Sequence, residues 1–320
     1  MILSFKNNPI FVHSFEYQLG SARRDLDQLQ AENLLLGPTE DLAAIGYHYN
    51  FGLGKTESLV GLTTNTVSRV LDSVEPSGFI FQHCYGESAV SPYDPGETSI
   101  PLRTRYFPAE VMRHLDVDHL PYFCSFATGC SGFTFLLGAA GGILATSSDQ
   151  RPTVCVMADR MPPGVPYNMQ EERILGSDHS SAFLVDRQPC GYQLLAVSYY
   201  STTRKKVPFL EIVKRTVGMI QELTKDLGIE LEENDLAVHY PNIFPETWKM
   251  VTRYLKSSRV EHVLDGLSER AHCMASDSVI SLKDHHRGQE GRIHIAINYG
   301  VGLHLAVCVL KERANKTSVD

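Results

Sequence analysis

The sequence predicts an α/β fold built from two similar halves. Apolar runs of strand length alternate with longer segments of helical spacing along all 320 residues. Neither a low-complexity tract nor a long linker interrupts this alternation, and a hydrophobic content of 43% is sufficient for a large core. A strand–helix–strand rhythm occurs in both halves, which indicates internal pseudo-symmetry. We therefore expect an N-terminal half over residues 1–175 and a C-terminal half over residues 176–320.

The first half is predicted to contain four strands and two helices. The helix at about 56–73 is indicated by Leu59, Leu62, Val67 and Val70, which recur near helical spacing. A second helix, over 131–145, is rich in Leu, Ala and Gly and directly follows a short apolar run that we interpret as a buried strand. The predicted strands lie at 9–19, 78–84, 120–126 and 153–158.

The second half repeats the alternation after the prolines of 162–166 interrupt the chain. Its predicted strands lie at 180–185, 192–201, 236–239, 292–298 and 303–310. Helices are predicted at about 208–227, at 245–257 and around 273–284.

Composition narrows the class of function. A net charge of −8 without a run of Lys or Arg argues against nucleic acid or an anionic membrane as partner. The first ten residues lack the pattern of a signal peptide, and the apolar segment 131–145 falls short of the roughly 18–20 residues that cross a bilayer. Seven cysteines, without a C-x-x-C pair, favour reduced thiols over disulfides or a zinc site. We expect a cytoplasmic protein without a metal.

Cys130 is the strongest candidate for a catalytic residue. It lies between the predicted strand 120–126 and helix 131–145, where the free N–H groups of a helix start point at its sulfur. Gly129 and Gly132 flank it, so a substrate carbonyl has room to approach the backbone. The alternative is a buried structural cysteine, because free cysteines are among the most buried residues.

The helix start cannot activate this thiol alone. An ordinary cysteine has a pKa of about 8.5, and a helix N-terminus contributes only roughly 0.3–1 kcal/mol, less than one pKa unit. A base or cation must therefore come from elsewhere in the chain.

Two histidines of the second half are candidates for that base. His239 stands just beyond an apolar strand, and Asn242 could fix its ring, although a satisfied core histidine is an equally ordinary role. His272 opens a small-residue helix, as Cys130 does, and Cys273 follows it; an exposed histidine at a helix start is the alternative.

Two further features are candidates for binding. The segment Tyr299–Gly302 joins two strands, and the N–H groups at Gly300 and Val301 would suit one side of an oxyanion hole, unless the segment is a plain hairpin turn. Arg173 is a candidate docking charge for a phosphopantetheine carrier or a nucleotide phosphate, the alternative being a solvated surface.

The order and spacing of four motifs resemble the thiolase superfamily, and in particular β-ketoacyl-acyl-carrier-protein synthase III. The motifs are Thr-Gly-Cys130-Ser-Gly-Phe, Gly176-Ser-Asp-His-Ser-Ser-Ala-Phe-Leu-Val185, Asp235-Leu-Ala-Val-His239-Tyr-Pro-Asn242 and Tyr299-Gly-Val-Gly302. They span essentially the whole chain. The family's patterns are A-C-(A/S)-G-F, G-D-G-A-(A/G)-A, H-Q-A-N and G-G-G-(L/F)-T.

The resemblance implies a thiolase-like, five-layered αβαβα fold with two pseudo-symmetric halves. It implies an acyl thioester on Cys130, with His239 as base or carbonyl donor and the N–H of Cys130 and the loop at Gly300 and Val301 around the oxyanion. It further implies a homodimer, or a heterodimer with a related subunit. The substrate is an acyl-CoA or a phosphopantetheine-linked acyl group on a carrier protein, with no cofactor held permanently.

The departures from the family pattern bear on the reaction. The family's G-N-T-S-A-A-S asparagine is missing, and His272 or Cys273 falls at its place. The only tryptophan, Trp248, lies in the wrong half for the usual coenzyme A entrance. These changes favour a specialised enzyme of secondary metabolism.

Two classes of function follow from the resemblance. The first is an acyltransferase or condensing enzyme that works through Cys130, either by decarboxylative condensation or by transfer to an oxygen, nitrogen or carbon nucleophile. The second is a non-catalytic partner subunit of a heteromeric synthase. A thioester hydrolase using the same cysteine is a further alternative.

Overall fold

Ten strands follow one another across the main sheet of the protein. The structure, a computed structural model, describes residues 1–72, 74–85, 90–91, 105–126, 128–162, 164–169, 173–204, 207–255, 259–264, 266–300 and 303–314. The strand order is β15 (Val260–Val263), β14 (Leu236–His239), β16 (Ile293–Gly300), β17 (His304–Glu312), β13 (Tyr192–Ser201), β2 (Ile10–Leu19), β12 (His179–Asp186), β9 (Thr153–Asp159), β5 (Gly78–Gln82) and β8 (Tyr122–Ser125). The short β1 (Ile2–Ser4) pairs with β13.

The sheet consists of two sets of five strands with the same pairing pattern. In the set from β15 to β13, the two outer pairs are parallel and the two inner pairs antiparallel. The set from β8 to β2 repeats this pattern. The expected pseudo-symmetry is therefore present, and the two sets separate between Asp186 and Tyr192, later in the chain than the expected boundary at 175/176.

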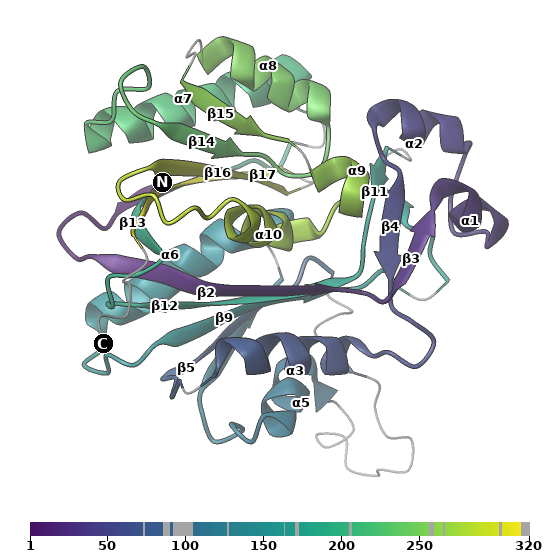
Figure 1. Ribbon diagram of the computed structural model, residues 1–320, viewed down its shortest axis with the longest axis horizontal. Coiled ribbons are helices and arrows are strands. Elements are labelled where there is room, and N and C mark those ends of the chain that lie inside the picture. The colour runs from purple at the N-terminus through teal and green to yellow at the C-terminus, as the bar shows by residue number, and fades with distance from the viewer. Residues whose placement is uncertain are drawn as a thin grey trace.

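Helices and sheet strands form five layers (Figure 1). The outer layer on one side contains α7 (Phe209–Leu227) and α8 (Pro245–Leu255), and the outer layer on the other contains α3 (Leu59–Val70) and α5 (Phe107–His114). Between the two sets of strands lie α6 (Gly132–Thr146) and α10 (Asp277–Asp284). The αβαβα architecture that the sequence predicts is thus confirmed.

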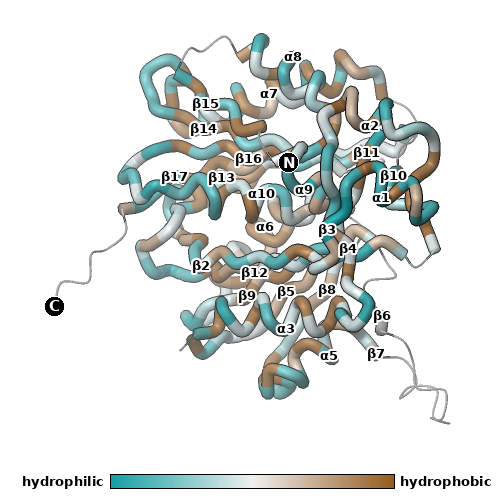
Figure 2. The backbone as a smooth tube through the Cα atoms, turned by 45° about the vertical axis from the view of Figure 1, so that its right-hand side comes forward, coloured by the Kyte–Doolittle hydropathy of each residue, from teal (hydrophilic) through white to brown (hydrophobic). Residues whose placement is uncertain are grey.

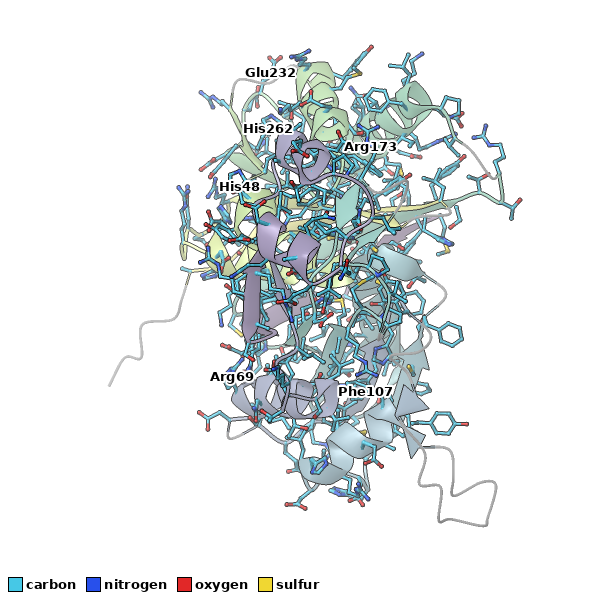
Figure 3. The ribbon with its side chains drawn as sticks, turned by 90° about the vertical axis from the view of Figure 1, so that its right-hand side faces the viewer. His48, Arg69, Phe107, Arg173, Glu232 and His262 are labelled. Atoms are coloured by element: carbon cyan, nitrogen blue, oxygen red, sulfur yellow. The ribbon has the colours of Figure 1, made fainter. Side chains whose placement is uncertain are left out.

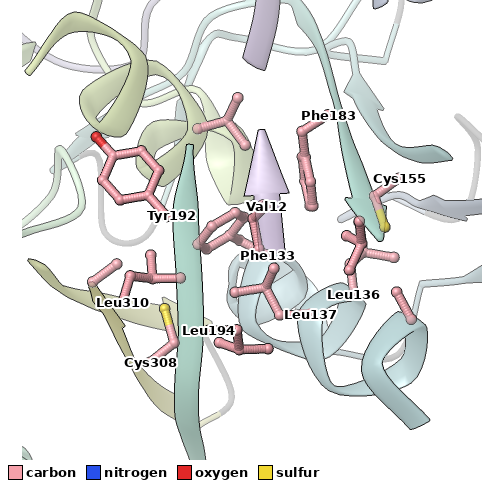
Figure 4. Close-up of a cluster of buried hydrophobic side chains, with 14 of the residues drawn as sticks. Val12, Phe133, Leu136, Leu137, Cys155, Phe183, Tyr192, Leu194, Cys308 and Leu310 are labelled. Carbon is pink, nitrogen blue, oxygen red and sulfur yellow. The ribbon is translucent and has the colours of Figure 1, made fainter. Parts of the chain in front are cut away.

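The central helix α6 is the middle of the main hydrophobic core. Phe133, Leu136 and Leu137 on this helix are fully buried and pack against residues of both sets of strands, as the close-up in Figure 4 shows. Separate clusters lie beneath α7 and α8 and beneath α3 and α5. In Figure 2 the brown, apolar stretches accordingly run along the strands and the inward helix faces.

The central helix also qualifies a sequence-based expectation. Together with its preceding 3-10 turn it spans Gly129–Thr146, which is long and apolar enough to cross a membrane, whereas we expected this segment to be too short. More than half of it is buried inside the protein, and mostly buried core helices pass the same test of length and composition. Length and apolar composition alone are weak evidence for a membrane span.

A group of short elements that the sequence did not predict lies beside the sheet, outside the five layers. It contains β3 (Ala22–Asp25), α1 (Leu26–Ala31), α2 (Thr39–Ile45), β4 (Tyr49–Gly52) and α9 (Gly266–Arg270), with the hairpin β10 (Asn168–Met169) and β11 (Ile174–Leu175). The start of α1 had a readable signal, because Asp25 and Gln28 form a capping box. The remaining small elements are β6 (Val90–Ser91) and β7 (Arg105–Tyr106).

Strand β8 differs from the prediction in its burial. The sequence predicts a buried strand at 120–126, and a strand does form at Tyr122–Ser125. It lies at the edge of the sheet, however, and Phe123 is 61% exposed. An apolar run alone does not distinguish a central strand from a strand at the edge of the sheet.

Candidate active site

Cys130 lies at the turn that leads into the central helix. A short 3-10 turn over Gly129–Ser131 connects directly to α6, as the sequence predicts. Gly129 has a φ of +50°, which favours glycine, and a Cβ on Gly132 would overlap the side chain of Gln82. Gly129 is therefore required by its backbone conformation and Gly132 by the close approach of Gln82, and Cys130 itself is half-buried rather than fully buried.

His272 is the imidazole that faces this cysteine. Its Nε2 lies 3.3 Å from the Sγ of Cys130, and its Nδ1 lies 2.6 Å from the Oδ2 of Asp277. The carboxylate can only accept a hydrogen bond, so the Nδ1–H group donates a hydrogen bond to Asp277, and Nε2 is left to take the proton of the thiol. Cys130, His272 and Asp277 therefore form a thiol–imidazole–carboxylate chain of the kind that activates a nucleophile.

The backbone around His272 is held on both sides. Its N–H donates to the carbonyl oxygen of Leu175, and its own carbonyl oxygen accepts from the N–H of Ser177. Ala271 and Met274 adopt φ values of +55° and +48°, which are uncommon for residues with a side chain. Strain of this kind persists only where surrounding contacts enforce it, and here it orients the ring toward Cys130.

Asp277 is fixed as firmly as the ring it supports. It is the first residue of α10, and its Oδ1 accepts from the N–H of Cys273 while its Oδ2 also accepts from the N–H of Asn242. Burial favours the neutral acid, but the charge and hydrogen bond of His272 outweigh it and lower the pKa of Asp277. Sequence reasoning missed this residue, although an acid in the first turn of a helix was a readable signal.

The electrostatics favour a thiolate at Cys130. A hydrogen bond from the thiol of Cys84 is the largest cause that lowers the pKa of Cys130; burial opposes it, and the positive charge of His272 adds to it. Burial lowers the pKa of His272, but the charges of Asp277 and Cys130 together raise it by more, so the pKa of His272 is raised overall. The two shifts together describe an imidazolium–thiolate pair.

Cys84 is a second thiol in the site that the sequence reading did not single out. Burial, together with its hydrogen bond to Cys130, raises its pKa well above the usual range. Cys84 therefore stays protonated and serves as a donor to the neighbouring sulfur. Cys84 lies two residues after the end of β5, and its N–H donates to both carboxylate oxygens of Asp159.

The structure does not bring His239 to Cys130. Its Nδ1 is bonded to the hydroxyl of Ser281 at 2.7 Å, and its Nε2 lies 2.9 Å from the Nδ1 of His294. His294 in turn is bonded to Glu312. Both ring nitrogens of His239 are therefore engaged, and burial lowers its pKa well below the ordinary value. This placement corrects the predicted Cys130–His239 dyad: His239 is a satisfied core histidine of the second half.

The predicted supporting residues have other partners than expected. Asn242 does not orient His239; its side-chain amide donates to the carbonyl oxygen of Ala271, directly before His272. It therefore supports the histidine that contacts the thiol. Cys273 is fully buried, and its sulfur faces the carbonyl oxygen of Arg270 at 3.8 Å. Of the two residues that could replace the family's asparagine, His272 is the one beside Cys130.

Gly300 lies against the backbone of the nucleophile. A Cβ placed on Gly300 would lie 3.0 Å from the carbonyl oxygen of Thr128 and 3.4 Å from the amide nitrogen of Cys130. A residue with a side chain would therefore crowd the space in front of the Cys130 N–H. Val301, the other residue of the predicted oxyanion loop, is outside the described residues.

Arg173 lines a cavity of about 600 Å³ at the surface. The other lining residues are Asp41, Ala44, Ile45, Phe209, Phe244, Pro245, Glu246 and Thr247. Figure 3, which views the molecule from the side of α1 and α2, shows Arg173 on this side. Phe244 is two residues beyond Asn242 and packs against Tyr299, so the cavity adjoins the segments that hold His272 and Gly300.

Metal binding finds no support among the placed side chains. Within the described ranges, no group of three or more His, Cys, Asp or Glu residues is arranged to hold a metal ion.

Comparisons with known proteins agree on the fold. No model of a protein family matches the sequence, and neither does any curated protein. Among solved structures, 3-oxoacyl-[acyl-carrier-protein] synthase III from Aquifex aeolicus VF5 superimposes with a TM-score of 0.74 at 14% identity, over 94% of this chain and 99% of that one. ChlB3, an acyltransferase, gives 0.74 at 16% identity over 96% and 98%.

A third similar structure is larger. An HMG-CoA synthase in complex with CoA has a TM-score of 0.69 at 15% identity, over 95% of this chain and 82% of its own. All three structures have the thiolase fold. The chain therefore has the thiolase-like fold of the 3-oxoacyl synthase III enzymes, with a cysteine, a histidine and an aspartate joined at its centre.

Proposed function

We propose that this protein is an acyltransferase that holds an acyl group as a thioester on Cys130 and passes it to a second substrate. The observation that carries the proposal is the hydrogen-bonded chain of Cys130, His272 and Asp277 at the start of the central helix. The similarity in fold to ChlB3 and to 3-oxoacyl synthase III supports it.

In the first half-reaction the Cys130 thiolate attacks the carbonyl carbon of the donor thioester. The developing oxyanion is stabilised by the N–H of Cys130 and by the loop that begins at Gly300. The donor's carbon–sulfur bond breaks, and the imidazolium of His272 gives its proton to the departing thiolate. The donor is an acyl-CoA or an acyl carrier protein, and the cavity at Arg173 is the proposed entrance for its phosphopantetheine arm.

In the second half-reaction His272 becomes the base. Once Cys130 is acylated, its negative charge is gone, and with it one cause of the raised pKa of His272. The neutral ring can then remove a proton from an acceptor hydroxyl or amine, which attacks the carbonyl carbon of the thioester. The bond between that carbon and the Cys130 sulfur breaks, the acylated product is released, and the thiolate is restored beside the imidazolium that Asp277 stabilises. This arrangement favours plain acyl transfer over decarboxylative condensation, because the second imidazole expected at Cys130, that of His239, is engaged elsewhere.

We further propose that the protein is a homodimer joined at β8. Among the described strands it ends the sheet, and Tyr122 and Phe123 on it and Phe126 directly after it are exposed. An apolar edge strand with free backbone groups is suited to pairing with a second copy.

Intact-protein mass spectrometry tests the acyl-enzyme. The wild-type protein is mixed with a panel of acyl-CoA donors and acyl carrier proteins, and one acyl mass is expected on Cys130. Cys130→Ala should take up none, whereas Cys190→Ala, a change of a half-buried cysteine between β12 and β13, should load normally. A panel without any adduct on Cys130 would refute the proposal.

Two alternatives have distinct outcomes in the same system. A hydrolase would release free acid without any acceptor. If the protein is a non-catalytic partner subunit, its Cys130→Ala variant would support the activity of the sibling subunit as well as the wild type does. An adduct that disappears only when an alcohol or amine is added supports the transferase.

A further inference from the structure

Met274 is a buried methionine whose presence the apolar cores do not explain. It is 3% exposed and is the first residue of the 3-10 turn Met274–Ser276, which leads directly into α10. Among the described residues, none of the four apolar clusters includes it. Filling a hydrophobic core is the ordinary role of a buried methionine, so this one needs another explanation.

The backbone at Met274 would suit a glycine. Its φ of +48° is close to the φ of +50° at Gly129, and each of the two residues opens a 3-10 turn that leads into a helix of the middle layer. The first half of the molecule has a glycine at this position, which adopts a positive φ without strain. The second half has a long side chain there, so the side chain rather than the backbone must account for the methionine.

The side chain of Met274 reaches the proposed nucleophile. Its Sδ lies 4.0 Å from the Sγ of Cys130, which is a van der Waals contact. The Nε2 of His272 lies 3.3 Å from the same sulfur, and Cys84 is a further neighbour. Gly300 closes the backbone side, where a Cβ would lie 3.4 Å from the amide nitrogen of Cys130. An acyl group bonded to the sulfur must therefore displace one of these neighbours.

Of the side chains around the sulfur, that of Met274 is the one that can move aside. The ring of His272 is fixed by its hydrogen bond of 2.6 Å to Asp277. The backbone of Cys84 is held by Asp159, and its side chain is too short to swing away. A methionine side chain is unbranched and has several rotatable bonds, so it can turn away as an acyl group arrives. The volume that it vacates then limits the size of the acyl group.

We infer that Met274 selects the acyl group, because it admits a short, unbranched acyl chain on Cys130 and excludes bulky ones. The inference rests on the function proposed for Cys130 and names the substrate class of that site, a thioester of a small acyl group such as acetyl. The carbonyl oxygen of the thioester faces the N–H of Cys130 and Gly300, and the acyl chain occupies the space from which Met274 withdraws. Met274 thus determines specificity without taking part in proton transfer.

Acyl groups of different size test the inference. Intact-protein mass spectrometry follows the loading rate of Cys130 with acetyl-CoA and with phenylacetyl-CoA, or with the same two acyl groups on a carrier protein. The wild type is expected to load the acetyl group about tenfold faster or more, since a small mismatch of size in a closed site has an effect of this order. A wild type that loads both groups equally fast would overturn the inference.

Two substitutions at the same position separate size from other effects. Met274→Gly removes the side chain and suits the positive φ, so the rate of phenylacetyl loading relative to acetyl loading should rise by about tenfold. Loss of structure would not produce such a gain. Met274→Leu keeps a similar volume, so its rate ratio should stay close to that of the wild type. An equal rise in both variants would show that volume is not the cause, and the inference would fail.

Alkylation distinguishes a failure of the inference from a failure of the proposed function. Iodoacetamide and the bulkier N-phenyl-iodoacetamide both react with the Cys130 thiolate without any acyl donor. Met274→Gly should raise the relative rate of the bulkier reagent at Cys130 by about tenfold, while the ratio at the half-buried Cys190 stays the same.

If acetyl loads but Met274→Gly leaves the acyl rate ratio unchanged, the inference is wrong and the proposed function stands. If no donor loads Cys130 in any variant, the proposed function is wrong, and the alkylation ratio alone decides whether Met274 limits what the sulfur can carry. An alkylation ratio that is the same in the wild type and in Met274→Gly would then overturn the inference as well.

Discussion

The proposed reactivity of Cys130 depends on a neighbour that is 142 positions away in the chain, and that neighbour depends on a buried carboxylate. The thiol alone would be only a few per cent ionised at neutral pH. The imidazolium of His272 balances the negative charge of the Cys130 thiolate, and the carboxylate of Asp277 stabilises that imidazolium although it is buried. Each of the three side chains therefore needs the next.

His272→Ala tests the base directly. Acyl loading of Cys130 should slow by about 100-fold or more, because both proton transfers lose their catalyst. The rate is measured by quenched-flow mass spectrometry with one acyl donor. His239→Gln is the matched change in the other histidine, and its loading rate per folded molecule should remain near that of the wild type. If acyl loading were slow in His239→Gln and fast in His272→Ala, His239 rather than His272 would be the base.

Asp277→Asn tests the pH dependence. In the wild type the pKa of Cys130 is lowered, so loading should be constant at neutral pH and fall only when acid protonates the thiolate. Without the carboxylate, His272 is charged less often and Cys130 loses its cation. The direct repulsion between Asp277 and Cys130 is also removed, but it is a smaller cause than the attraction of His272. The pH at which loading is half-maximal should therefore rise.

At the scale of elements, two helices of the middle layer divide the work. The start of α6 presents Cys130, and the start of α10 presents Asp277. One turn further along α10, Ser281 binds His239 and connects it to His294 and Glu312. The same helix therefore supports the active chain with one residue and a buried structural network with another.

Gly132→Ala tests how closely α6 approaches β5. A Cβ at this position would lie 2.1 Å from the Cδ of Gln82, so Gln82 must move and lose its bond to the carbonyl oxygen of Gly129. We expect the unfolding free energy to fall by about 1–3 kcal/mol, with a lower Tm, and acyl loading to slow.

Gly142→Ala on the same helix is the control. A Cβ there meets no atom within 4 Å, so the better helix propensity of alanine should raise stability by up to about 1 kcal/mol. Both variants are compared by thermal and urea unfolding. Equal stability of the two would show that Gly132 is not required by close packing.

At the scale of the whole molecule, the site exists only where the two sets of strands meet. Cys130 comes from the chain before β12, whereas His272 and Asp277 come from the chain after β13. A parallel bridge between Gly176 and His272 joins the two parts beside the site. Neither half would contain a complete chain of thiol, imidazole and carboxylate.

Phe123→Lys tests the proposed dimer. A lysine on the exposed edge strand β8 would bring like charges together across a strand pair, so the protein should shift toward the monomer in light scattering after size-exclusion chromatography. Leu36→Lys, which changes a 50% exposed leucine outside β8, should leave the mass unchanged. A dimer that tolerates Phe123→Lys would place the interface elsewhere.

Local patterns in the sequence predicted an α/β fold of two similar halves and placed Cys130 at a helix start, whereas the five layers were implied by the resemblance to the thiolase superfamily. The alternation of apolar strands and helices depends on neighbours in the chain, and so does the glycine-flanked turn before α6. The same local reasoning failed for the burial of β8 and for the short elements around α1 and α2. Their fate depends on what packs against them.

The partner of Cys130 could only be decided by tertiary structure. His239 and His272 each follow a plausible pattern in the sequence, and nothing local states which ring faces the thiol. The choice depends on the register that joins His272 to Gly176 and on the enforced φ values at Ala271 and Met274. Sequence determines the residues that are available for chemistry, whereas long-range packing determines which of them come within a hydrogen bond of each other, because contacts between distant segments have no local signal.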